Sequence, residues 1–291
     1  MEYTRVDFRD EISRNNLKSV LLMISIFIVF VLFGYVISFA FDPGFFFVIM
    51  IISIIFSLSY ILISYYNSGK IAVASVKAQE VKRHDNKQYY DLVEGLTIAS
   101  GLPMPKLYIM NSEQINAFAS GRNPDNAVVC VTKGALEKLD KRELEGVLAH
   151  EMSHVANYDM RYMTLATVMV GMIAIISEIF LRSLWFRGGG DNKNVVFIIL
   201  GIAMAILAPI IVYLVQLAIS RKREYTADAT AVKFTRYPSG LIGALKKIES
   251  ENKPEKKISK ALAPLFFSNP FKGLRSTHPE IGKRIERLQK M

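Results

Sequence analysis

Residues 20–66 read VLLMISIFIVFVLFGYVISFAFDPGFFFVIMIISIIFSLSYILISYY, and this run determines the class of fold. It holds two apolar stretches, 20–41 and 45–66, and neither contains a charged residue. About 20 apolar residues in a helix are enough to cross the hydrocarbon core of a bilayer. The intervening Asp42-Pro43-Gly44 is typical of a tight turn. The run therefore predicts two membrane-spanning helices joined as a hairpin.

Two more apolar stretches follow, over 163–185 and 195–220. The chain is thus predicted to cross the membrane four times, in agreement with its content of 51% hydrophobic residues. The third stretch contains Glu178 and Arg182, which are spaced to pair on one helix face. Charged groups inside a span face protein or water rather than lipid. We expect the pair to face the helix bundle near the membrane interface, with a functional role for Glu178 as the alternative.

Basic residues near the span ends predict the orientation of the chain. They gather before the first span and after the second, and the turn between these spans has none. Because cytoplasmic segments are enriched in Lys and Arg, both termini and both large polar segments, 67–162 and 221–291, are predicted to be cytoplasmic. The expected location is the cell (plasma or inner) membrane. The formal net charge of +10 agrees with basic residues that face anionic lipid.

The four spans divide the chain into four parts. Residues 1–66 comprise the cytoplasmic N-terminus and the first hairpin, and residues 163–220 comprise the second hairpin. Residues 67–162 and 221–291 are then two cytoplasmic parts of one domain. The chain is expected to be a polytopic α-helical membrane protein with a cytoplasmic α+β domain.

The polar segment after the second span alternates between helical and strand patterns. Asp140 and Glu143 form a capping box at the start of a helix that carries an apolar stripe. Gly and Pro separate the other periodic stretches and predict turns between them. The expected elements are a helix over 86–100, a strand over 106–110, a hairpin of 116–119 with 127–132, and the capped helix over 141–158.

Composition also excludes some partners. The only cysteine, Cys130, rules out an intramolecular disulfide and fits a reducing compartment. The sequence has no signature of RNA or DNA binding, so nucleic acid is not an expected partner. The expected surroundings are the lipid bilayer, and the oligomeric state is not predicted.

The capped helix carries two of the four histidines of the chain, in LAHEMSHVANYD, residues 148–159. His150 and His154 are one helical turn apart, so each can direct a nitrogen at one cation. Glu151 can then act on water at that cation, which is the mechanical basis of the H-E-x-x-H pattern of zinc proteases. Two structural core histidines are the alternative, and the spacing together with the adjacent acid disfavours it.

A catalytic zinc site commonly has three protein ligands and one open position. The best remaining acid lies directly after the fourth span, in SRKREYTADA, residues 220–229. Glu224 and Asp228 fall on one face of a helix that continues from the span. Glu224 can complete the ligand set, and Asp228 can accept a hydrogen bond from a ligand histidine and fix its tautomer. An even number of spans returns His154 and Glu224 to the same side of the membrane.

These motifs, with Asn116-Ala117-Phe118-Ala119 upstream and Ser276-Thr277-His278-Pro279 near the end, resemble the HtpX family of membrane zinc proteases. This family is related to the type I CAAX prenyl proteases. The resemblance runs through nearly the whole chain. It implies a gluzincin-like site with one catalytic Zn²⁺, held by His150, His154 and Glu224.

The resemblance also implies an activity. Glu151 would be the general base and Asp228 the carboxylate that supports a ligand. The enzyme would be a zinc metalloendopeptidase that cleaves misfolded or damaged membrane proteins, or unfolded polypeptides, on the cytoplasmic side, as part of protein quality control under stress. The ligands lie close in sequence to the spans, so the zinc is expected near the cytoplasmic membrane surface.

Three further residues remain open at the level of sequence. Asn116 begins a stretch that either holds an extended substrate by strand addition or is an ordinary core strand. His278 either donates a hydrogen bond to the developing oxyanion or serves only as a helix-start residue before Pro279. Asp159 either ends the HExxH helix or supports the metal site.

Two other functions are weighed against this one. A CAAX-type prenyl protease uses the same chemistry on lipidated C-termini, but such enzymes are longer and have more spans. A non-catalytic membrane scaffold or transporter would hold a structural metal, but such a site has no use for Glu151 beside its ligands.

Overall fold

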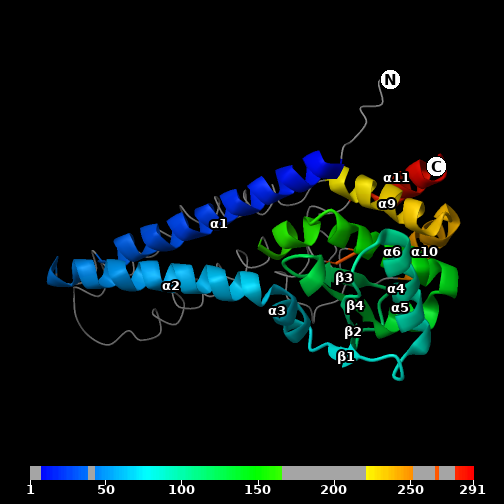
Figure 1. Ribbon diagram of the computed structural model, residues 1–291, viewed down its shortest axis with the longest axis horizontal. Helices are drawn as coiled ribbons and strands as arrows, with labels where there is room; N and C mark the ends of the chain where they lie inside the picture. Colours follow the sequence, from blue (N-terminus) through cyan, green and yellow to red (C-terminus); the bar gives the residue numbers. More distant parts are fainter. Residues whose placement is uncertain (1–7, 39–42, 166–220, 252–265, 269–278) are drawn as a thin grey trace, which may run out of the picture.

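The computed structural model describes residues 8–38, 43–165, 221–251, 266–268 and 279–291. Its first two long helices, α1 (Phe8–Ser38) and α2 (Phe46–Tyr66), pack side by side, and the short 3-10 helix η1 (Pro43–Phe45) precedes α2 (Figure 1). The two long helices are apolar enough to cross a membrane, α1 over Asn15–Tyr35 and α2, together with η1, over Pro43–Tyr66. The predicted first hairpin agrees with this arrangement.

The surface of α2 distinguishes it from the core helix of a soluble protein. Only 11% of its apolar window is buried, against 39% for α1. Large side chains such as Phe47 and Ile55 are therefore exposed along its length. An apolar surface of this extent is suited to lipid rather than water. The predicted third and fourth spans lie almost wholly outside the described residues, as do Glu178 and Arg182.

A four-stranded mixed sheet forms the centre of the α+β part. Its strand order is β1 (Gln79–Val81), β2 (Lys106–Met110), β4 (Val128–Thr132) and β3 (Ala117–Ser120). Strand β2 is parallel to β4, and the two outer pairs are antiparallel. The edge strand β3 faces the helix α6 (Lys141–Ala156). The elements between α2 and α6, in chain order, are α3 (Ser68–Ser75), β1 (Gln79–Val81), α4 (Lys87–Ser100), β2 (Lys106–Met110), β3 (Ala117–Ser120), the 3-10 helix η2 (Pro124–Asn126), β4 (Val128–Thr132) and α5 (Lys133–Lys138).

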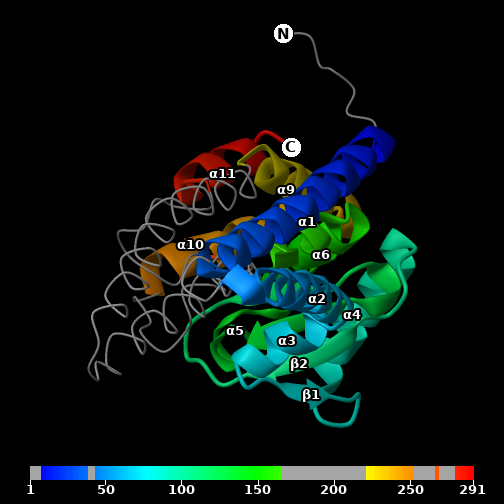
Figure 2. The same cartoon turned by 90° about the vertical axis from the view of Figure 1, so that its left-hand side faces the viewer.

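The helix α6 (Lys141–Ala156) lies between this sheet and a layer of C-terminal helices (Figure 2). The predicted capping box begins it: Asp140 accepts from the Glu143 backbone amide, and Glu143 accepts from that of Asp140. Gly146 permits close packing, because a Cβ there would lie 2.6 Å from the Leu241 nitrogen. The C-terminal layer consists of α9 (Arg221–Thr235), α10 (Pro238–Glu251) and α11 (Ile281–Leu288).

The end of α6 differs from the predicted boundary at residue 158. The helix ends at Ala156, Asn157 caps it, and Tyr158 adopts a left-handed conformation with φ of 59°. Residues 159–165 are helical again. The left-handed residue turns the chain and brings Asp159 back toward the last turn of α6. The prediction missed this because Tyr158 gives no sequence signal for positive φ.

Candidate metal centre

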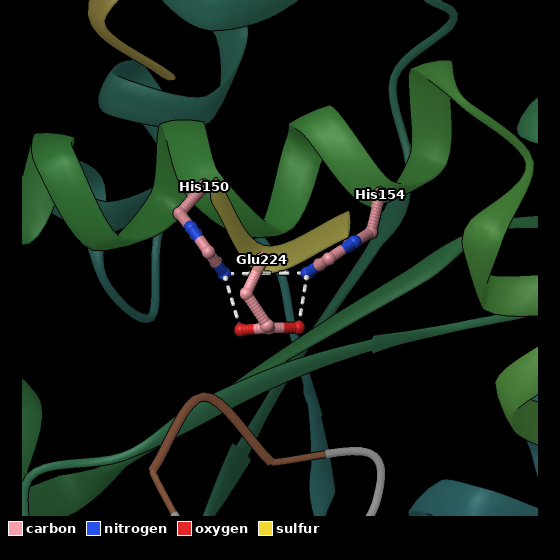
Figure 3. Close-up of side chains that lie close together, drawn as sticks. All are labelled: His150, His154 and Glu224. Atoms are coloured by element: carbon pink, nitrogen blue, oxygen red, sulfur yellow. Dashed lines mark hydrogen bonds and ion pairs between the residues drawn. The ribbon is translucent and has the colours of Figure 1, made fainter. Parts of the chain in front are cut away.

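Two helices bring three potential ligands to one point. His150 and His154 lie one turn apart on α6, and Glu224 lies in the first turn of α9 (Figure 3). The two Nε2 atoms are 3.2 Å apart. The Glu224 oxygens Oε2 and Oε1 lie 3.7 Å from the Nε2 atoms of His150 and His154, respectively. The structure thus brings two histidines of α6 together with an acid that follows His154 by 70 positions in sequence.

The geometry and the donor types fit a zinc ion. Tetrahedral zinc with bonds near 2.0–2.1 Å holds its ligand atoms about 3.3 Å apart, close to the separations of these three groups. All three side chains are buried, and burying them without a shared partner would be costly. Within the described parts of the chain, no other group of three His, Cys, Asp or Glu residues is arranged to hold a metal.

The far nitrogen of His150 faces an ion pair between α9 and α11. His150 Nδ1 lies 2.9 Å from Asp228 Oδ1, and Arg284 donates to both oxygens of Asp228, at 2.6 and 2.9 Å. Arg284 Nη2 is also 3.3 Å from Nδ1, but a guanidinium has only donors. We therefore assign the Nδ1 proton to the bond with Asp228, which leaves the Nε2 lone pair for a metal.

Electrostatics strengthen this arrangement. Burial alone would raise the pKa of Asp228, but Arg284 and His150 outweigh burial and lower it to about 2. Burial and Arg284 lower the pKa of His150, whereas Asp228 and Glu224 raise it, with a net value of about 9. Asp228 is therefore a permanent anion at neutral pH. A metal at this site has to displace a proton from His150.

The far nitrogen of His154 faces the membrane hairpin. Its Nδ1 lies 3.1 Å from Asp159 Oδ2. Asn15 of α1 donates through Nδ2 to Asp159 Oδ1 at 2.7 Å and to the Asn157 carbonyl at 3.2 Å. Asp159 is buried, and Arg223 Nη1 approaches it only to 3.9 Å. Of the two alternatives for Asp159, the structure places its side chain beside the metal cluster.

Glu151 lies beside the ligands and against the edge strand. Its side chain is 2% exposed, and its carboxylate interacts with the Ala119 backbone of β3. Its Oε1 has no hydrogen-bond partner among the described residues. Burial raises the pKa of Glu151, while His150 and His154 act in the opposite direction. A buried carboxylate with a free oxygen is suited to accept a proton at this position.

The two other sequence candidates have different outcomes. Asn116 is buried directly before β3, and its side-chain amide forms hydrogen bonds with the backbone of Ser268. His278 lies outside the described residues, although the following Pro279 is buried.

Sequence reasoning missed Arg284, Asn15 and the segment Phe266–Ser268. Arg284 is 1% exposed, although it is an arginine. A signal existed for Arg284, because it lies within the apolar stripe of α11, and a charge in such a stripe needs a buried partner. That stripe consists of Ile281, Arg284, Ile285 and Leu288. Asn15 is a single polar residue in front of an apolar span, and it gave no comparable signal.

Two imidazoles from one helix, a carboxylate from a second helix and an acid beside them are the arrangement of a metal-dependent peptidase. The comparisons with known proteins agree with this class. The chain belongs to peptidase family M48, whose model matches residues 83–291.

Close relatives extend over almost the entire sequence. A protein named "Protease HtpX homolog" from Dictyoglomus thermophilum is 41% identical over 289 residues, which cover 98% of this chain and 95% of the relative. One of the same name from Lactobacillus helveticus is 38% identical over 296 residues, covering 97% and 99%. The crystal structure of S. mikatae Ste24p has a similar fold, with a TM-score of 0.53 and 17% identity, covering 96% of this chain and 66% of Ste24p.

Proposed function

We propose that this membrane zinc metalloprotease cleaves misfolded or damaged membrane proteins, and unfolded polypeptides, on the cytoplasmic side of the cell membrane. The observation that supports this most is the buried cluster of His150, His154 and Glu224. It lies next to Glu151 and an edge strand, in a chain with two helices suited to a bilayer. An edge strand is the feature that can hold an extended polypeptide by backbone hydrogen bonds.

In this proposal the three ligands hold one Zn²⁺. When bound, zinc lowers the pKa of a water molecule and polarises the scissile carbonyl. Glu151 accepts a proton from water at its free Oε1 and passes the proton to the leaving amine. Burial raises the pKa of Glu151, which makes its carboxylate a stronger base for the first of these steps. Asp228 and Asp159 hold the histidine rings so that each Nε2 faces the ion.

The position of α1 supports a site close to the membrane. Asn15 is the first residue of the apolar window of α1, and it is hydrogen-bonded to Asp159 beside the metal cluster. The window thus begins where the metal centre lies. We infer that substrates reach the centre from the membrane or its immediate vicinity. The basic residues around the spans support four crossings with both termini in the cytoplasm.

The other two functions are less well supported. A CAAX-type prenyl protease is suggested only by the likeness to Ste24p, which concerns the fold and covers 66% of that protein. Relatives that match the chain over nearly its whole length carry the HtpX name instead. A scaffold with a structural metal leaves unexplained the buried Oε1 of Glu151, which has no partner among the residues that the structure describes.

The decisive test replaces Glu151 with Gln. We expect E151Q to keep stoichiometric zinc and to lose at least about 100-fold in cleavage of an unstructured, membrane-anchored peptide, because only the base is removed. Zinc content and turnover are measured on the purified protein in lipid nanodiscs. E137Q, at an exposed position on α5, is the matched control and should behave as wild type. Undiminished turnover by E151Q would exclude Glu151 as the general base.

A further inference from the structure

The outer edge of β3 is already paired with another part of this chain. Phe266 forms an antiparallel bridge with Phe118, and the backbone amide of Phe267 donates to the Ala117 carbonyl at 2.8 Å. The rings of Phe118 and Phe266 contact edge to face, with centroids 5.3 Å apart. Residues 266–268 therefore lie against β3 as an extended peptide would.

Asn116 binds the next residue of the segment, Ser268, and it does so through the backbone of Ser268 alone. Its Nδ2 donates to the Ser268 carbonyl at 2.8 Å, and its Oδ1 accepts from the Ser268 amide at 3.1 Å. A side-chain amide that satisfies both backbone groups of one residue does not depend on the identity of that residue. This is the kind of contact that can bind many different polypeptides.

The segment also contacts the metal centre. The ring of Phe267 lies 4.8 Å from that of His150, at 90°, and Arg284 Cζ lies 4.7 Å from the centroid of the same ring. Phe267 is 2% exposed. On the same strand, the Ala119 backbone interacts with Glu151. The segment thus lies along the edge that a substrate needs if its carbonyl is to reach both the ligands and the base.

We propose that Phe266–Ser268 is an internal ligand of the substrate cleft. It occupies the backbone positions of an extended substrate on β3, and it leaves the edge when a polypeptide binds. This rests on the proposed function. Phe267 also indicates the substrate class: a peptide with a large apolar, preferably aromatic, side chain beside His150 and Arg284, where a cation–π contact stabilises it.

The release of the internal ligand can be tested at Ser268, whose contacts with Asn116 are made by its backbone. Ser268→Pro removes the amide donor to Asn116, and Ser268→Ala keeps it. An internal competitor raises KM without changing kcat, so S268P should lower KM for an unstructured peptide about fivefold, the effect of one hydrogen bond. S268A should match wild type. An S268P enzyme with unchanged or higher KM would overturn the proposal.

The opposite test fixes the segment in place. The non-hydrogen-bonded pair Phe118 and Phe266 is close enough for a disulfide in F118C/F266C. Cys130 lies opposite Phe118 on β4, so Cys130→Ala is included and is the control on its own. The oxidised enzyme should cleave at least about tenfold more slowly than the same protein after reduction, which is an increase of ~1.4 kcal/mol in the activation free energy. Equal rates in both states would overturn the proposal.

The two proposals fail in different ways. Zinc-loaded wild type and S268P that both leave every unstructured peptide intact would contradict the proposed function. Wild type that cleaves, together with an S268P that binds no better, would contradict only the internal ligand.

Discussion

His150 and His154 lie one turn apart on the same helix, but different regions of the molecule support them. Behind His150 stand Asp228 and Arg284, from α9 and α11. Behind His154 stands Asp159, which the α1 residue Asn15 holds in place. One histidine is therefore fixed by the C-terminal helices and the other by the membrane hairpin.

The two supports differ in charge. Arg284 is a buried cation that donates to both oxygens of Asp228, so the two charges depend on each other. Asp159 has a neutral amide as its nearest partner outside the metal cluster, and its arginine neighbour is 3.9 Å away. Loss of the first support leaves a buried charge without its ion-pair partner, whereas loss of the second removes hydrogen bonds and only a long ion pair with Arg223. The His150 side should therefore matter for stability, and the His154 side for coupling to the membrane helices.

The largest effect is expected at Asp228. D228N leaves the buried Arg284 without its ion-pair partner, which costs about 3–5 kcal/mol of the free energy of unfolding. It also weakens the support of His150, so zinc affinity should fall about 10–100-fold. Thermal unfolding and a zinc titration against a chelator measure the two effects. The exposed D125N is the matched control. Wild-type stability in D228N would contradict the mutual dependence of the two charges.

The second prediction separates the effect of the buried charges on stability from the support that Asp228 gives to His150. In D228N/R284M both charges are removed, so no ion remains buried without a partner. The double variant should be more stable than D228N by about 2 kcal/mol or more, because replacing both members of a buried pair costs less than breaking it. Zinc affinity should stay reduced, since His150 still lacks a carboxylate. Equal unfolding free energies for the single and double variants would show that the pair is not coupled.

The third prediction concerns the membrane side. The ion pair that D159N removes is the long 3.9 Å contact with Arg223, whose guanidinium still lies over the Tyr162 ring, so the loss of stability should be clearly smaller than in D228N. Zinc affinity should still fall by about tenfold, because the carboxylate that orients His154 is gone. The same two measurements apply. If D159N destabilises the protein as much as D228N does, the contrast between the two regions is wrong.

Local spacing explains which parts of the site could be predicted. His150 with His154, and Glu224 with Asp228, are pairs four residues apart, and helical periodicity places each pair on one face. Asn15 and Asp159 are 144 residues apart, and Asp228 and Arg284 are 56 apart. Such partners depend on how the helices pack, which one sequence does not reveal. The pairing of the internal ligand, Phe266–Ser268, with β3 was not predicted for the same reason.

The same distinction between nearby and distant residues explains which parts of the fold could be predicted. The strand over 106–110, the β3–β4 hairpin and the capped start of α6 agree with the structure, since each follows from nearby residues. The parallel pairing of β2 with β4 was not predicted, because β3 comes between them in the chain but lies at the sheet edge. The end of α6 was missed at Tyr158, where the backbone adopts a positive φ that the residue type does not signal.

The smallest effect is expected at Asn15, and it tests whether the membrane helix acts on the metal centre at all. N15A removes one hydrogen bond to Asp159, so zinc affinity should fall about fivefold. N16A is the matched control, because Asn16 is adjacent but accepts from Arg161 instead. N15A removes the hydrogen bonds of α1 to Asp159 and to the Asn157 carbonyl, and N16A removes the one from Arg161, yet only N15A should change zinc affinity. Equal affinities in N15A and N16A would mean that α1 packs beside the site without positioning His154.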